Sequence, residues 1–196
     1  MRKILLWLVA TGLLVVVSPA VGKARERGHD IRWDLVQIVQ GTVLAGGTDA
    51  GQDAASQDTV SLTGSGSADP DERGATGGGL FVHKHANGTE VAHGVYVVTG
   101  LVRWRPAGGS LTPAGVADGI GHLSETRAGI LRMTVRLFPA GALPGTHADG
   151  ILTVNCALPG ETFAITEGIT LAVGPFHFTQ HGGGTLFHVQ HDGEDD

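Results

Sequence analysis

Residues 77–105, GGGLFVHKHANGTEVAHGVYVVTGLVRWR, decide the fold that the sequence predicts. Two strand-like runs flank Asn87-Gly88. Asn-Gly between such runs is the strongest short-range signal of a β-hairpin, because both residues tolerate the positive φ angles of a type I′ turn. Gly100 interrupts the second run and indicates a bend or a bulge. We therefore expect a hairpin followed by a further short strand.

The hairpin predicts one cluster of polar side chains. A two-residue turn pairs His83 with Ala92 and His85 with Glu90, and side chains alternate between the faces of a strand. His83, His85 and Glu90 then share one face. Two imidazoles and a carboxylate suit Zn²⁺ or a similar divalent cation, and an open coordination position could activate water. The alternative is an exposed hairpin tip with solvated polar side chains, and a one-residue bulge, for example at Gly94, would change the pairing beyond it.

The rest of the chain favours an all-β fold. Glycine makes up 32 of the 196 residues and is scattered at turns without the period of collagen. We expect two long surface loops, over 45–58 and 64–79, and about nine or ten short strands. Besides the hairpin, the strand candidates are 31–39, 42–44, 59–63, 129–138, 151–156, 162–166, 168–173, 175–180 and 185–190.

These strands predict one mostly antiparallel domain over residues 31–191. No convincing long helix and no internal repeat interrupts it. A β-barrel and a β-sandwich give the same alternation of apolar and polar residues, so both architectures stay open.

The N-terminus has the pattern of a secretory signal peptide over residues 1–20. Arg2 and Lys3 precede an apolar run, ILLWLVATGLLVVV, and small residues lead to a cut after Ala20, with Ala24 as the alternative. A retained membrane anchor is the other interpretation, but the run is short for a span. We expect a flexible segment over 21–30, an acidic tail over 192–196, and a mature chain without a transmembrane span. The expected location is secreted, periplasmic or in the cell envelope.

Charge and cysteine content exclude some classes of partner. The formal charge is −6, and loss of Arg2 and Lys3 with the signal peptide makes it −8. An acidic chain without a basic stripe does not predict nucleic-acid binding, because phosphate contacts supply most of that affinity. Cys156 is the single cysteine, so no intramolecular disulfide can form, and its alternation with Leu152 and Val154 predicts a buried thiol.

Six segments together resemble a family of uncharacterised small secreted bacterial all-β proteins. They are TGGGLF (76–81), GVYVVTGLVRW (94–104), AGILRMTV (128–135), ILTVNCALPG (151–160), EGITLAVGPFHF (167–178) and GTLFHV (184–189). The resemblance covers most of residues 31–189 in order. It implies a single secreted β-domain that closes with the TLFHV strand. It implies no catalytic residue, because the family has no established activity.

The sequence holds no complete catalytic constellation. His181-Gly182-Gly183-Gly184 copies the oxyanion loop of some lipases, but no G-x-S-x-G nucleophile elbow accompanies it. We therefore expect non-catalytic binding of a small ligand or a protein partner, in an apolar pocket lined by residues such as Trp33, Trp104 and Phe176. One alternative is a metal-binding protein or metal-dependent enzyme using His83, His85 and Glu90. The other is a structural, envelope-associated protein.

Overall fold

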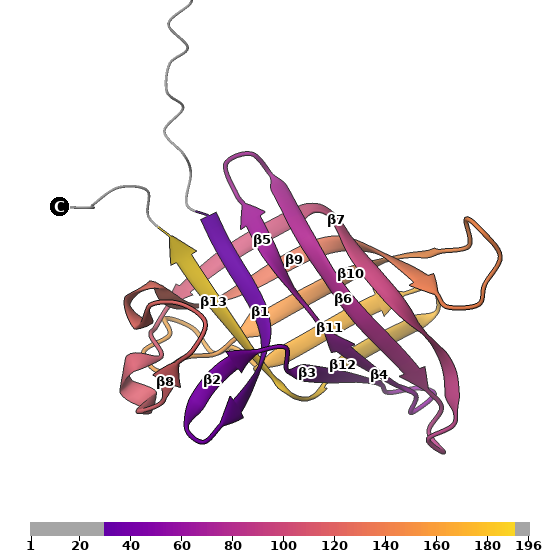
Figure 1. Ribbon diagram of the computed structural model, residues 1–196, viewed down its shortest axis with the longest axis horizontal. Helices are drawn as coiled ribbons and strands as arrows, with labels where there is room; N and C mark the ends of the chain where they lie inside the picture. The colour runs from indigo at the N-terminus through magenta and orange to yellow at the C-terminus, as the bar shows by residue number, and fades with distance from the viewer. Residues whose placement is uncertain (1–29, 191–196) are drawn as a thin grey trace, which may run out of the picture.

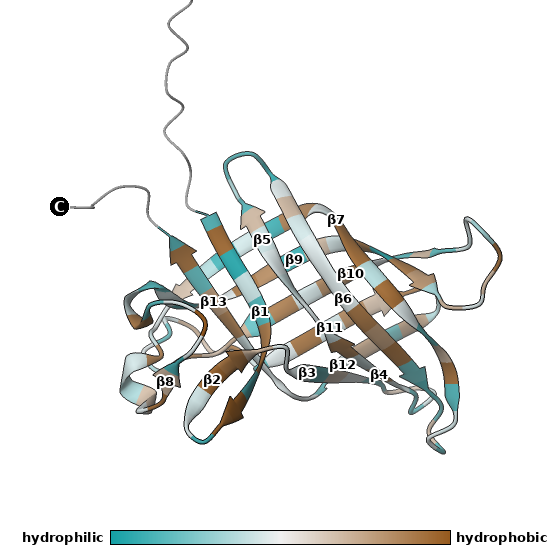
Figure 2. Ribbon diagram, viewed as in Figure 1, coloured by the Kyte–Doolittle hydropathy of each residue, from teal (hydrophilic) through white to brown (hydrophobic). Residues whose placement is uncertain are grey.

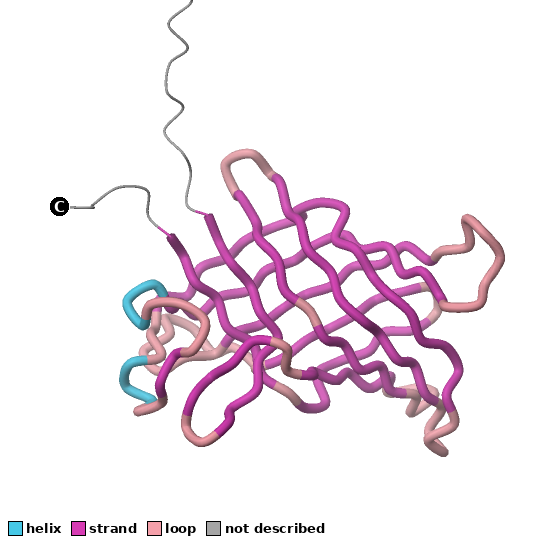
Figure 3. Tube along the Cα trace, viewed as in Figure 1, coloured by secondary structure: helices cyan, strands magenta, loops and turns pink. Residues whose placement is uncertain are grey.

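The computed structural model describes residues 30–190, and almost all of their regular secondary structure is β-strand. Two short 3₁₀ helices, η1 (Thr112–Ala114) and η2 (Leu123–Glu125), lie at the same end of the molecule as β8 (Ala117–Asp118) (cyan in Figure 3; β8 is labelled in Figure 1). The other strands are β1 (Asp30–Val39), β2 (Thr42–Ala45), β3 (Thr48–Asp53), β4 (Thr59–Thr63), β5 (Ser65–Asp69), β6 (Gly74–Lys84), β7 (Glu90–Gly108), β9 (Thr126–Pro139), β10 (Ala148–Cys156), β11 (Gly168–Val173), β12 (Phe176–Gly182) and β13 (Gly184–Gln190). The prediction of an all-β, mostly antiparallel fold is confirmed.

Eight strands form a circuit of antiparallel pairings that returns to its start. In order they are β9, β10, β11, β12, β3, β4, β6 and β7, and β7 pairs again with β9. In Figure 1, β10 and β11 cross behind β6. Every member of the circuit has a partner on both sides, which removes the open edge at which strands of different molecules pair.

The remaining strands extend this circuit. β13 pairs with the beginning of β9, β1 pairs with β13 and with β5, and β5 pairs with β6. β1 also pairs with β2, whose other partner is β8 in the one parallel pairing among the described strands. The first and last described strands therefore lie side by side (Figure 1).

Side chains that alternate along the strands build one apolar core. On β9, Leu131 and Met133 are fully buried, and Arg132 between them is exposed. Figure 2 shows the same alternation as bands of brown along the strands. Burial of a Leu or Met side chain contributes roughly 1.5–3 kcal/mol, so this pattern fixes which face of each strand points inward.

Trp33 of β1 packs against one pair of glycines on β5 and β6. Its indole is fully buried, and its Nε1 donates a hydrogen bond to the carbonyl of Thr76 at 3.3 Å. Gly66 and Gly77 are paired across β5 and β6, and a Cβ on either would come within 2.8 or 2.9 Å of the indole. A residue with any side chain at these positions would collide with the tryptophan.

Several local predictions were wrong. The loops expected over 45–58 and 64–79 contain β3, β5 and the first half of β6, and the strand expected over 162–166 is not formed. The bend or bulge predicted at Gly100 is confirmed as a register shift between Val98 and Gly100, but the two runs on either side of it belong to one strand, β7. In β5 and β6, a Cβ at Gly66, Gly77, Gly78 or Gly79 would come within 2.3 Å of a carbonyl oxygen, so these positions carry no apolar side chain that would mark a strand in the sequence.

The signal peptide predicted over 1–20, the flexible segment over 21–29 and the acidic tail over 192–196 lie outside the described residues. Asp30, expected in the flexible segment, begins β1. Within residues 30–190, no helix has the length and apolar character needed to cross a membrane.

Candidate functional site

The hairpin formed by β6 and β7 carries two of the predicted site residues. His83 pairs with Ala92, as expected, but Glu90 pairs with Lys84 and not with His85. The turn is longer than predicted: the amide of Gly88 donates to the carbonyl of His85, and the amide of His85 donates to the carbonyl of Thr89, each at 2.8 Å. Gly88 has a φ of 83°, and the turn has no other residue with positive φ. This geometry matches a three-residue loop that ends in a left-handed glycine, and it shifts Glu90 by one position.

Glu90 therefore lies away from the predicted cluster. Its Oε1 is 2.7 Å from Nδ1 of His93, and both side chains are about half exposed. Among residues 30–190, no group of three or more His, Cys, Asp and Glu is placed to hold a metal ion. A divalent metal at His83 and His85 stays a prediction, which elemental analysis of protein without a histidine tag would test.

Asp58, and not Glu90, is the carboxylate that contacts both histidines. Its Oδ2 lies 3.0 Å from Nε2 of His83 and 3.1 Å from Nδ1 of His85. Asp58 and His83 are largely buried, whereas the His85 side chain is 57% exposed. An ionised carboxylate can only accept, so both imidazoles donate at these nitrogens, and a neutral His83 keeps its Nδ1 as an acceptor.

Asp53 holds the loop that presents Asp58. Its Oδ2 accepts hydrogen bonds from the amides of Ala55 and Ser56 and from the Ser56 hydroxyl, and its Oδ1 accepts from the amide of His177. These donors, the Ser56 amide foremost, lower the pKa of Asp53 to about 2. The Ser56 hydroxyl oxygen in turn accepts from the amide of Asp58 at 3.2 Å. The position of Asp58 is therefore set by a fixed turn and not by a free loop.

His83 borders an apolar pocket of about 220 Å³, here called the end pocket. The rings of Phe176 and Phe178 stack 5.4 Å apart, and the His83 ring lies edge-on to them at 4.9 and 5.3 Å. Seven of the eight circuit strands contribute to the lining, and His83 is its one ionisable residue. The lining is Val60, Phe81, His83, Ala92, Leu137, Pro139, Ala148, Leu171, Val173, Gly174, Pro175, Phe176 and Phe178.

Two of the three aromatic residues expected in an apolar pocket do not line this one. Trp33 is buried in the core, and Trp104 packs edge-on against Phe187 at 5.0 Å. Phe176 does line the end pocket. The sequence thus indicated the two histidines and one phenylalanine of the site, but not Asp58, because that residue ends a stretch of small polar residues typical of a surface loop.

The end pocket can hold an uncharged molecule against apolar walls and offer it one oriented imidazole. Comparison of the chain with protein-family models, with curated proteins and with solved structures found no match.

Proposed function

We propose that this protein binds a small, neutral, largely apolar organic molecule in the end pocket. The observation that carries the proposal is an almost wholly apolar lining with a single, oriented polar side chain, His83. Ligand pockets are typically apolar with a few placed polar groups, and the open ends of β-barrels are common positions for them. We interpret the closed circuit as such a barrel, with the end pocket at one of its mouths.

The size and shape of the pocket favour an aromatic ligand. A cavity of about 150 Å³ lined by Leu, Ile and Phe accepts benzene, so about 220 Å³ suits one ring with a short substituent. The rings of Phe176, Phe178 and His83 offer faces and edges for stacked and edge-to-face contacts. A hydroxyl on the ligand would donate a hydrogen bond to Nδ1 of His83. The proposed class is therefore a monocyclic aromatic with one hydroxyl.

NMR titration with p-cresol and with toluene tests this proposal. The two probes differ in one hydroxyl, and a neutral hydrogen bond contributes about 1 kcal/mol, so p-cresol should bind about fivefold more tightly. The substitution His83→Phe keeps an aromatic ring and removes the acceptor, and it should abolish the preference for p-cresol. An unchanged preference in that variant would refute the role of His83.

A second pair of variants tests the location without touching His83. Ala92 lines the end pocket, and Val91 is its exposed neighbour, 45% exposed and outside the lining. Ala92→Phe should fill the pocket and reduce the affinity for both probes at least tenfold, whereas Val91→Phe should leave it unchanged. Equal affinity in wild type and Ala92→Phe would place the probes elsewhere and would overturn the proposal.

Secretion remains part of the proposal and is supported by the pattern of residues 1–20. N-terminal sequencing of exported protein tests it, with Val21 as the expected first residue.

A further inference from the structure

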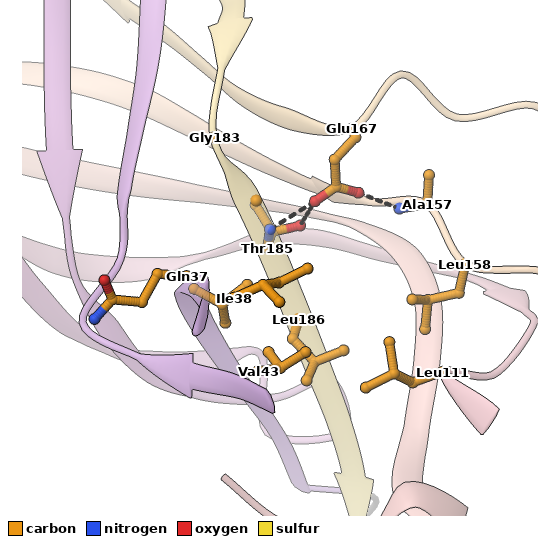
Figure 4. Close-up of a pocket in the computed structure, with 12 residues that line it drawn as sticks. Gln37, Ile38, Val43, Leu111, Ala157, Leu158, Glu167, Gly183, Thr185 and Leu186 are labelled. Carbon is orange, nitrogen blue, oxygen red and sulfur yellow. Dashed lines mark hydrogen bonds between the residues drawn. The ribbon is translucent and has the colours of Figure 1, made fainter. Parts of the chain in front are cut away.

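A second cavity, of about 460 Å³, lies beside β13 and is here called the side cavity. Figure 4 shows Glu167 and Thr185 together at one end of it and Val43, Leu111 and Leu186 farther from Glu167. The complete lining is Val36, Gln37, Ile38, Val43, Leu111, Ala157, Leu158, Glu167, Gly183, Gly184, Thr185 and Leu186. The cavity is therefore apolar along most of its wall, with one acidic end.

Glu167 is held by hydrogen bonds at the acidic end of the cavity, and its ionised form retains one acceptor position. Its Oε1 accepts from the amide of Thr185 at 2.6 Å and lies 2.8 Å from the Thr185 hydroxyl, which also lies 2.7 Å from the carbonyl oxygen of Asn155. Its Oε2 accepts from the amide of Ala157 at 2.5 Å (Figure 4). A carboxylate has about four acceptor positions, so one on Oε2 remains. None of the lysines, arginines and histidines of residues 30–190 forms an ion pair with Glu167.

Two further carboxyl groups, Asp49 and Glu161, lie outside the lining of the cavity but interact electrostatically with Glu167. Asp49 is fully buried, and its carboxyl lies against Gly183, where a Cβ would come within 2.5 Å of the carboxyl carbon. Asp49 Oδ2 and Glu161 Oε2 are buried without a hydrogen-bond partner among the described residues. Burial raises the pKa of Glu167, and the charge of Glu161 adds to this rise. At pH 8, above the pKa of about 7 that burial gives Asp49, negative charge therefore accumulates here, and no cation among residues 30–190 forms an ion pair with Glu167. Such charge is costly at low dielectric.

We propose that the side cavity binds an amphipathic organic cation, with a protonated primary amine at Glu167 and an apolar chain along Leu111, Leu158 and Leu186. The ammonium group can donate a hydrogen bond to the remaining position on Glu167 Oε2, and its positive charge balances the negative charge of that carboxylate. The apolar chain gains from leaving water. An anion of the same shape is repelled, and a neutral analogue gains from the apolar wall alone. This site is independent of the end pocket and of its ligand.

Calorimetric titration of the full chain with octylammonium, octanol and octanoate at pH 8 tests the proposal. The three probes share one chain and differ in the charge of the head group. Octylammonium should bind about tenfold more tightly than octanol, and octanoate should not bind measurably. Glu167→Gln should bring octylammonium to the affinity of octanol. Equal affinity of octylammonium and octanol for the wild type, or binding of octanoate, overturns the proposal.

A variant at the rim of the side cavity provides a second test in case Glu167→Gln does not fold. Ile38 lines the side cavity and is 64% exposed, so Ile38→Trp should be tolerated and should block the cavity, with at least a tenfold loss of octylammonium affinity. Val39 is its neighbour on β1, 44% exposed and outside the lining, and Val39→Trp should have no effect. Ala92→Phe, which closes the end pocket, should also leave octylammonium binding unchanged. Unchanged binding in Ile38→Trp, or lost binding in Ala92→Phe, contradicts the proposed site.

Discussion

Asp49 is an ionisable residue buried inside the protein, where a charged group is unfavourable. Its side chain is fully buried on β3, its Oδ1 accepts from the amide of Ala50, and its Oδ2 has no hydrogen-bond partner among residues 30–190. Burial raises its pKa from 3.8 to about 7, assisted by the charge of Glu167 and opposed by the amides of Ala50 and Ile169. The folded protein therefore holds a proton on Asp49 that the unfolded chain releases near pH 4.

This difference predicts how Asp49 contributes to stability as the pH changes. Because the folded state binds the extra proton, the contribution is greatest below pH 4 and is lost as the pH rises to about 7. Asp49→Asn has no such dependence. The free energy of unfolding of wild type, relative to Asp49→Asn, should fall by about 2–4 kcal/mol between pH 4 and pH 8, at about 1.4 kcal/mol per pKa unit. Urea unfolding of both proteins at several pH values measures this, and parallel pH profiles would contradict it.

The sequence predicted the two histidines of the site but not the carboxylate that contacts them. The spacing of His83 and His85 places both side chains next to one carboxylate, as predicted for a hairpin strand. That carboxylate is not Glu90, because the turn is one residue longer than predicted and Glu90 pairs with Lys84. Asp58 is 25 residues away from His83 along the chain and meets it only because β4 pairs with β6. Such a contact follows from strand order, which no local pattern in a glycine-rich sequence encodes.

Among the elements, β5 and β6 are paired strands whose backbones lie very close to each other and to Trp33. Gly77 has a φ of 122°, and its Cβ position is 2.3 Å from the carbonyl oxygen of Ser65 and 2.9 Å from the Trp33 ring. Neither a left-handed backbone nor this space suits a residue with a side chain. The fully buried Trp33 therefore requires glycine on the strands that cover it.

Gly77→Ala should lower the free energy of unfolding by about 3 kcal/mol, because it combines overpacking with an unfavourable backbone conformation. Gly74→Ala is the matched control on the same strand, where a Cβ would meet nothing within 4 Å and φ is not positive. That variant should change stability by less than about 1 kcal/mol in either direction. Chemical denaturation of the two variants gives the comparison, and similar effects of both would disprove the role assigned to Gly77.

The sequence predicted strands well where large apolar residues alternate and poorly where small residues do. β9 and β10 were recognised because Leu, Met and Val mark one face. β3, with the sequence TDAGQD, and β5, with SGSAD, offer no such contrast, although Asp49, Gly51 and Asp53 are buried. Their burial depends on what packs over them, so only the assembled molecule reveals them as strands.

At the scale of the whole molecule, closure of the circuit links the stability of its strands. β10 is paired along its length with β9 and also with β11, so it cannot separate without breaking two ladders. β8, by contrast, has two residues and pairs only with β2 among the described strands. Local opening should therefore be easy at β8 and should require global unfolding at β10.

Cys156, at the end of β10, reports this difference directly. Its side chain is fully buried, its Sγ donates to the carbonyl of Thr185 at 3.4 Å, and burial raises the pKa of the thiol, so the native thiol should not react with a disulfide reagent. Labelling should occur only through unfolded molecules, and the opening free energy from its rate should match that from denaturant unfolding within about 1 kcal/mol. In Ala117→Cys, which adds an exposed thiol on β8, one thiol per chain should react at once while Cys156 remains protected. Labelling of Cys156 at a rate independent of denaturant would mean that β10 opens locally, and the circuit would then not act as one cooperative unit.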